Sequence, residues 1–134
     1  MIKNINGIAC LIFMLLASSC KDGGCNTVLN SVVNETLPLE KSLELTLANS
    51  WTYANGGGCG LIVYNTGNNV VAYDRCSTMS ESANSKVQVE GLQIVDQSTG
   101  AKWLLLDGSP THLAECSLRR YQVRKNGNLY VITN

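Results

Sequence analysis

The segment YQVRKNGNLYVIT, residues 121–133, decides the fold class. Polar and apolar residues alternate on both sides of Asn126-Gly127. An Asn-Gly pair between two alternating runs is the strongest short-range signal of a β-hairpin, because the tight turn needs positive φ angles that these two residues adopt readily. The segment therefore predicts two antiparallel strands joined by a two-residue turn.

The sequence before this hairpin contains more apolar runs of strand length. They are Leu43–Leu47, Leu61–Tyr64, Val70–Tyr73, Lys86–Glu90, Leu92–Asp96 and Trp103–Leu106. The first of these alternates strictly, and turns at 65–69 (NTGNN) and at Gly91 join the next four into hairpins. Beyond the first twenty residues, no stretch of a dozen keeps the period of an amphipathic helix. The pattern predicts an all-β fold of small antiparallel sheets, a sandwich or barrel.

Residues 1–19 are typical of a lipoprotein signal peptide. Lys3 gives a positive start, and residues 8–16 (IACLIFMLL) form an apolar run shorter than the ~20 residues of a transmembrane helix. Small residues at 17–19 precede Cys20. We expect export, cleavage before Cys20 and attachment of lipid to its thiol. An ordinary secretory signal cut near the same place is the alternative.

This reading divides the chain into three parts: the signal peptide, a lipidated N-terminus and tether over residues 20–36, and one β domain over residues 37–134. The expected location is the bacterial envelope, anchored in the outer membrane on its periplasmic face or at the cell surface. Ten basic and ten acidic residues balance, and no basic stretch is arranged to follow a duplex or an anionic membrane surface, so nucleic acid is not an expected partner. The expected partners are the membrane, through lipid, and a protein or small molecule that the sequence does not identify.

Four cysteines remain when the signal peptide and Cys20 are set aside: Cys25, Cys59, Cys76 and Cys116. An even number of cysteines in an exported chain predicts disulfides, and four cysteines allow three pairings among which sequence does not choose. The rival interpretation is a zinc site. The four cysteines form no C-x-x-C pair, and the chain's single histidine lies near only one of them, Cys116, which favours disulfides and no metal.

The titratable residues do not form a recognisable catalytic set. His112 lies near Glu115 and Asp107, but no nucleophile motif or second metal ligand follows at a useful spacing, so we expect a solvated loop histidine. Asp96 and Asp107 are expected to form turns rather than an acid–base pair. The sequence therefore predicts no catalytic residues and no enzymatic activity.

Aromatic and basic residues have structural explanations as well. Trp51, Tyr53 and Trp103 could line a ligand groove, but aromatic side chains of a small β domain are more often core residues. Arg124 lies in the predicted strand at 121–125, and Arg120 directly precedes this strand on the same face. We expect them to form a solvated strand edge that discourages aggregation.

Three segments follow one another in a recognisable order: LIVYNTGNNVVAYDR at 61–75, GAKWLLLDGSP at 100–110, and Leu118-x-x-Tyr121-x-Val123 followed by Gly127-Asn128-Leu129. Together they resemble the Rieske [2Fe–2S] domain family, in particular the small Rieske-like lipoproteins of bacteria. The resemblance covers roughly residues 37–134. It implies small antiparallel sheets carrying three loops that converge at one tip.

The resemblance also locates the positions of the cluster ligands. Rieske domains hold [2Fe–2S] through C-x-H in one loop and C-x-x-H in another, with two thiolates on one iron and two imidazoles on the other. The matching positions here are Cys76, Thr78, Asp96 and Thr99. Only the cysteine is retained, and hydroxyl and carboxylate groups do not replace thiolate and imidazole ligands. We expect a degenerate site without a [2Fe–2S] cluster or another cofactor.

Convergence of the three loops further implies a disulfide pairing. Cys76 and Cys116 are expected to form one bridge at the tip, and Cys25 and Cys59 the other. The expected function is that of an exported lipoprotein whose cluster-free Rieske-like domain serves as a structural or binding module. The alternatives are a [2Fe–2S] Rieske-type electron-transfer protein, similar to a ferredoxin subunit, and a thiol/disulfide redox role of Cys76 and Cys116.

Overall fold

The computed structural model describes Cys25, residues 31–82 and residues 85–134. These contain ten strands and three short 3₁₀ helices, with no α-helix among them: β1 (Asn34–Pro38), η1 (Leu39–Lys41), η2 (Leu43–Thr46), β2 (Trp51–Ala54), β3 (Leu61–Asn65), β4 (Val70–Asp74), η3 (Ser80–Ser82), β5 (Gln88–Glu90), β6 (Gln93–Val95), β7 (Lys102–Leu104), β8 (Pro110–His112), β9 (Arg120–Asn126) and β10 (Leu129–Thr133). The all-β prediction is confirmed. The predicted signal peptide and Cys20 lie outside the described residues. No helix in the described part of the chain is both long and apolar enough to cross a bilayer.

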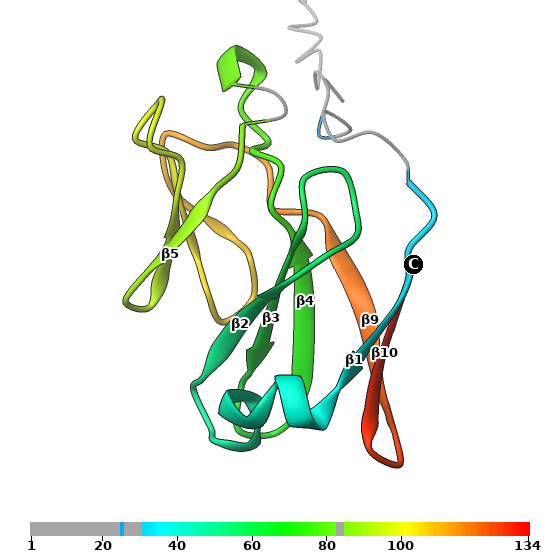
Figure 1. Cartoon of the computed structure of the whole chain (residues 1–134). Helices are drawn as coiled ribbons and strands as arrows, with labels where there is room; N and C mark the ends of the chain where they lie inside the picture. Colours follow the sequence, from blue (N-terminus) through cyan, green and yellow to red (C-terminus); the bar gives the residue numbers. More distant parts are fainter. Residues whose placement is uncertain (1–24, 26–30, 83–84) are drawn as a thin grey trace, which may run out of the picture.

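The strands form two antiparallel sheets of different size (Figure 1). The larger has six strands in the order β1-β10-β9-β4-β3-β2, and the smaller has four in the order β5-β6-β7-β8. The outer strands of the larger sheet are β1 and β2. The chain passes from one to the other through η1 and η2, along the lower end of that sheet in Figure 1.

Strands β3 and β4 are buried on both faces, which explains their uninterrupted apolar sequences. Along β3, Leu61 and Val63 pack into a core cluster on one face, together with side chains of β9 and β10. Ile62 and Tyr64 point the other way, into a second cluster that includes Trp103 of the smaller sheet. The β3–β4 hairpin is therefore the wall shared by the two cores.

The C-terminal hairpin is confirmed, and its turn forms at Gly127 with φ 58°. Arg120 and Arg124 of β9 are exposed. The prediction that they mark a sheet edge is wrong, because β9 pairs with β10 on one side and with β4 on the other. Alternation of polar and apolar residues along a strand shows which face of the sheet is solvated. It does not show whether the strand pairs with another strand on each of its two edges.

The predicted strand at Leu43–Leu47 is also wrong, because this segment belongs to η2. Its alternation buries a single side chain: Leu45 is 0% exposed, while Leu43 and Leu47 are each 68% exposed. The hydroxyl of Ser42 donates to the carbonyl of Pro38 at 3.0 Å and closes the preceding turn. The other predicted strands occur with small shifts of their ends.

Three strands were not predicted: β1, β2 and β8. Strand β1 begins at Asn34, inside the segment assigned to the tether, and pairs with β10 from Asn34 opposite Thr133. All three are edge strands of their sheets. An edge strand needs apolar side chains at few positions, so its sequence shows little alternation.

Candidate functional site

Three loops meet at one end of the molecule, as the resemblance implied. The Ser77 hydroxyl, after β4, donates to Asp96 Oδ2 at 2.7 Å, after β6. The Thr78 hydroxyl donates to the carbonyl oxygen of Cys116, between β8 and β9, at 2.9 Å. The same carbonyl accepts from Trp103 Nε1 at 2.8 Å. The loops that carry the degenerate ligand positions are therefore joined directly by side-chain hydrogen bonds.

Asp96 is the centre of the first group of polar residues at this tip. Its carboxylate is completely buried. Its donors are the hydroxyls of Ser77, Ser82, Ser85, Ser98 and Thr99, together with the backbone N–H of Ser98. Burial raises the pKa of Asp96, but the hydrogen bonds from Ser82, Ser77 and Ser98 outweigh it and hold the pKa well below its usual value. Asp96 forms the predicted turn, and it also connects two loops as an ionised carboxylate.

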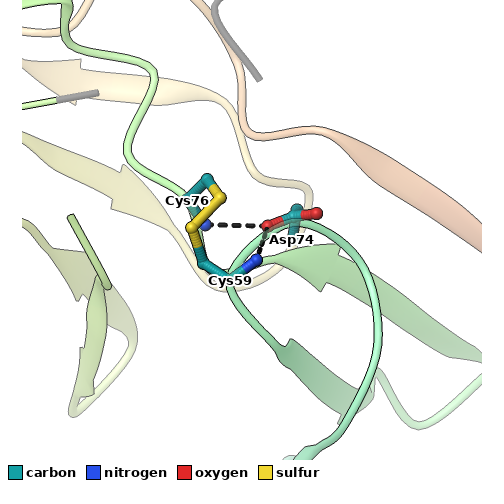
Figure 2. Close-up of side chains that lie close together, drawn as sticks. All are labelled: Cys59, Asp74 and Cys76. Atoms are coloured by element: carbon teal, nitrogen blue, oxygen red, sulfur yellow. Dashed lines mark hydrogen bonds between the residues drawn. A yellow bond between two sulfur atoms is a disulfide. The ribbon is translucent and has the colours of Figure 1, made fainter. Parts of the chain in front are cut away.

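Cys76 belongs to a second group, which Figure 2 shows with Cys59 and Asp74. Cys76 is bonded to Cys59 in a disulfide. The carboxylate of Asp74 lies beside it, is completely buried, and accepts from the backbone N–H of both cysteines. These N···O distances are 3.2 Å for Cys59 and 2.9 Å for Cys76. Asp74 therefore fixes the backbone on both sides of the disulfide.

Two further donors complete the shell of Asp74. Its Oδ2 accepts from the Gly58 N–H at 2.6 Å and from the Tyr121 hydroxyl at 2.7 Å. Burial and the hydrogen bond to Asp74 raise the pKa of Tyr121 to about 12, so the hydroxyl keeps its proton and remains a donor. Each carboxylate oxygen thus accepts two hydrogen bonds, which uses all four lone-pair directions.

The glycine-rich loop at 56–60 is needed for this close approach. A Cβ on Gly57, which has φ 64°, would lie 2.4 Å from Asp74 Oδ2. A Cβ on Gly58 would lie 2.8 Å from Cys76 Sγ. Side chains at these positions would push the loop away from the carboxylate and the disulfide.

The predicted disulfide pairing is wrong, although all four cysteines are bridged. The structure pairs Cys25 with Cys116 and Cys59 with Cys76, with Cα–Cα distances of 5.3 and 5.0 Å. The second pair follows from strand register. Leu61 lies opposite Asp74, and continuing the antiparallel register two residues further puts Cys59 opposite Cys76. The two cysteines are equidistant from the turn of the β3–β4 hairpin, a signal that the sequence contained.

Tryptic mapping without reduction is expected to recover this connectivity. Cleavage after lysine and arginine places each cysteine in its own peptide: residues 22–41, 42–75, 76–86 and 103–119. Mass spectrometry should find 22–41 joined to 103–119, and 42–75 joined to 76–86. Peptide 76–86 joined to 103–119 would restore the pairing implied by the resemblance and contradict the register argument.

The site does not fit a [2Fe–2S] cluster. A Rieske cluster needs two thiolates and two imidazoles. At the matching positions the sulfur of Cys76 is part of a disulfide and is not a thiolate. The Asp96 carboxylate accepts hydrogen bonds from protein donors, and the Thr78 hydroxyl donates a hydrogen bond to a backbone carbonyl. The chain's single histidine, His112, is exposed at the end of β8.

Cys59, Asp74 and Cys76 have a ligand spacing that suits a metal ion, with one donor atom of each lying within 4.8 Å of the others. Sequence reasoning missed this group. A soft metal would need both cysteines as thiolates. In the disulfide form neither sulfur is a thiolate, and every lone pair of Asp74 already accepts a hydrogen bond. The group is therefore arranged to support a disulfide.

The remaining predicted residues do not form a site with this group. Asp107 forms the predicted turn, accepting from the backbone N–H of Ser109 at 2.9 Å. Trp103 is a core residue, as expected. Tyr53 is 38% exposed, and the guanidinium carbon of Arg75 lies 3.7 Å from the centre of its ring. Trp51, whose ring centre is 4.8 Å from that of Tyr53, is only half-buried.

Comparison with solved structures finds chains of similar fold, among them the following two. The ferredoxin of carbazole 1,9a-dioxygenase from Nocardioides aromaticivorans IC177 is 19% identical, with a TM-score of 0.48 over 78% of this chain and 98% of that chain. A protein described as a nitrite reductase NADPH small-subunit oxidoreductase is 11% identical, with a TM-score of 0.47 over 78% of this chain and 100% of that chain. No family model and no curated protein matches the sequence. Neither structural similarity is high enough to identify a family.

Proposed function

We propose that this chain is an exported lipoprotein whose cluster-free Rieske-like domain serves as a structural or binding module in the bacterial envelope. One observation carries the proposal. At the positions where a Rieske domain binds iron, the chain has a disulfide and a carboxylate that protein hydroxyls saturate. These groups join the loops covalently and through hydrogen bonds, which is a structural role that a cluster would otherwise fill.

The electron-transfer alternative needs ligands that the chain lacks. The Cys59–Cys76 disulfide would first have to be reduced to thiolates, and the cluster would still need two imidazoles in a chain that has one histidine. The thiol/disulfide alternative now concerns Cys59 and Cys76. Both are buried, with exposed fractions of 8% and 1%, so an attacking thiolate has little access to either sulfur. We expect a stable structural disulfide with a reduction potential below about −300 mV.

Iron and acid-labile sulfide content tests the absence of a cluster. The protein is produced together with cluster-assembly machinery and purified without oxygen. We expect no iron and no labile sulfide above background, and no visible absorption. About two of each per chain, the stoichiometry of a [2Fe–2S] centre, would overturn the proposal and restore the electron-transfer role.

Fractionation of a Cys20→Ser variant tests the anchor. Lipid on Cys20 is the proposed membrane attachment, so the variant should move from the membrane to the soluble fraction, while wild type stays with membranes. A Cys10→Ser variant is the matched control, because Cys10 lies in the segment that is removed. A Cys20→Ser protein that still partitions wholly with membranes would contradict lipidation at this residue.

A further inference from the structure

A hollow of about 400 Å³ lies between β1 and β2, the two outer strands of the larger sheet. Its walls come from residues 35–38 of β1 on one side and from Tyr53 and Ala54 of β2 on the other. Pockets of 300–1,000 Å³ are the usual size of small-molecule sites. The gap between the edges of this curled sheet is therefore large enough for a ligand.

The hollow carries an excess of positive charge. Lys41, Arg75 and Lys86 line it, and Glu35 is the only acidic residue among its lining residues. No carboxylate among the described residues pairs with any of the three cations. A net charge of about two positive units inside a concave surface favours a doubly charged anion.

Arg75 is held in place before any ligand arrives. Its Nε donates to the carbonyl of Val87 at 3.1 Å, and its guanidinium stacks on the ring of Tyr53. These two contacts fix the plane of the guanidinium but leave its terminal nitrogens without a carboxylate partner. An arginine fixed in this way can bind two oxygens of a phosphate at once.

The disulfide described above supports this wall of the hollow. Gly60 and Arg75 both line the hollow, and each is the chain neighbour of one cysteine of the Cys59–Cys76 bridge. The Arg75 N–H also donates to the Gly60 carbonyl at 2.8 Å. The bridge and Asp74 therefore fix the backbone from which the Arg75 side chain extends.

We propose that this hollow is a binding site for a phosphate group, with Arg75 as its main ligand and Lys41 and Lys86 as supporting charges. A phosphate monoester carries about −1.5 to −2 charges at pH 7 and matches the charge of the site. Leu37 and Tyr53 also line the hollow, and their apolar surface suits an organic group on that phosphate. The site deepens the binding role proposed above and rests on it.

Titration followed by amide NMR tests the site on the purified protein, in the form that the cell produces and in a non-ionic detergent. One arm adds glycerol 3-phosphate, a soluble monoester. The other adds dihexanoylphosphatidylglycerol, a phosphodiester lipid headgroup, below its micelle concentration. Chloride keeps the ionic strength constant in both. Saturable shifts at Tyr53, Arg75 and Lys86 are expected in at least one arm, and the tighter arm identifies the source of the phosphate.

Variants decide whether the binding belongs to this hollow. Arg75→Gln should weaken binding about tenfold, because it removes the fixed guanidinium and about 1.4 kcal/mol corresponds to that factor. A Lys41→Gln/Lys86→Gln variant, which keeps the stack on Tyr53, should weaken it in the same direction. Arg124→Gln is the matched control, since Arg124 is exposed on β9 outside the hollow.

The outcomes separate this site from the proposed function. The site is refuted if neither ligand gives saturable shifts, or if the pocket variants bind as tightly as Arg124→Gln. That result would leave the iron measurement, and with it the cluster-free role, unaffected. A protein that contains a cluster but binds phosphate at Arg75 would refute the role and keep the site.

Discussion

Replacing Asp74 by asparagine is expected to lower the free energy of unfolding by about 3 kcal/mol or more. Each of the two carboxylate oxygens of Asp74 accepts two hydrogen bonds, and all four donors belong to buried or half-buried residues. An asparagine amide keeps one acceptor oxygen and turns its NH₂ group toward two donors. Flipping the amide does not remove the conflict. With the NH₂ group toward Gly58 and Tyr121 the tyrosine hydroxyl can rotate to accept, but the Gly58 N–H still faces a donor.

Urea denaturation of wild type, Asp74→Asn and Tyr121→Phe at pH 7 measures this effect. Tyr121→Phe removes one of the four donors and should cost about 1–2 kcal/mol. A thiol assay under denaturing conditions checks that each variant keeps both disulfides, so that a lost bridge is not mistaken for lost hydrogen bonds. An Asp74→Asn variant within about 1 kcal/mol of wild type would show that the carboxylate contributes little to stability.

The central strands of the fold could be predicted from the sequence. The sequence pattern is clear for four strands, which have long runs of apolar or alternating residues: β3, β4, β9 and β10. The turn between the last two is predicted by Asn126-Gly127. The segment at 43–47 was wrongly predicted as a strand because its leucines alternate with polar residues. Only Leu45 of the three leucines is buried, where it packs against the larger sheet. An alternating pattern predicts that one face of a segment is buried, and burial of one leucine of three does not make that segment a strand.

The candidate site was only half visible in the sequence. The resemblance pointed to the loops of Cys76 and Asp96, because those positions follow strands whose order is recognisable, and the structure brings the two loops into contact. Asp74 was not singled out, although an aspartate directly after four apolar residues of a buried strand signals a buried charge that must be satisfied. Three of its four donors come from the glycine loop and from Tyr121, which are distant in sequence, so only the tertiary structure brings them together.

The two buried carboxylates, Asp74 and Asp96, connect different loops at the tip. Asp74 joins the β2–β3 loop, the end of β4 and β9, while Asp96 joins the loop after β4 to the loop after β6. Cys76 and Ser77 are adjacent, so one residue of this loop serves each carboxylate. These hydrogen bonds form a polar network that holds three loops in one arrangement, and Arg75 lies in sequence between Asp74 and Cys76.

Stability is expected to fall in acid through Asp96. The pKa of Asp96 is held below its ordinary value of 3.8 in the folded protein, so the unfolded chain takes up the proton first as the pH falls. Its contribution is therefore complete above about pH 5 and is lost progressively as the pH falls through 4 toward the folded pKa. In Asp96→Asn this acid-sensitive contribution is absent.

Unfolding free energies at pH 7, 5, 4 and 3 test this for wild type, Asp96→Asn and Asp107→Asn. Asp107 is a matched control, because it makes the same bonds to the backbone N–H and hydroxyl of Ser109 that Asp96 makes to Ser98, but it is exposed. Asp96→Asn should cost about 2–4 kcal/mol at pH 7, because several buried hydroxyls lose an ionised acceptor, and the deficit should shrink below pH 4. Asp107→Asn should cost less than about 1 kcal/mol. A deficit for Asp96→Asn that stays constant from pH 7 to 3 would show that hydrogen bonding to the charged form is not what stabilises the tip.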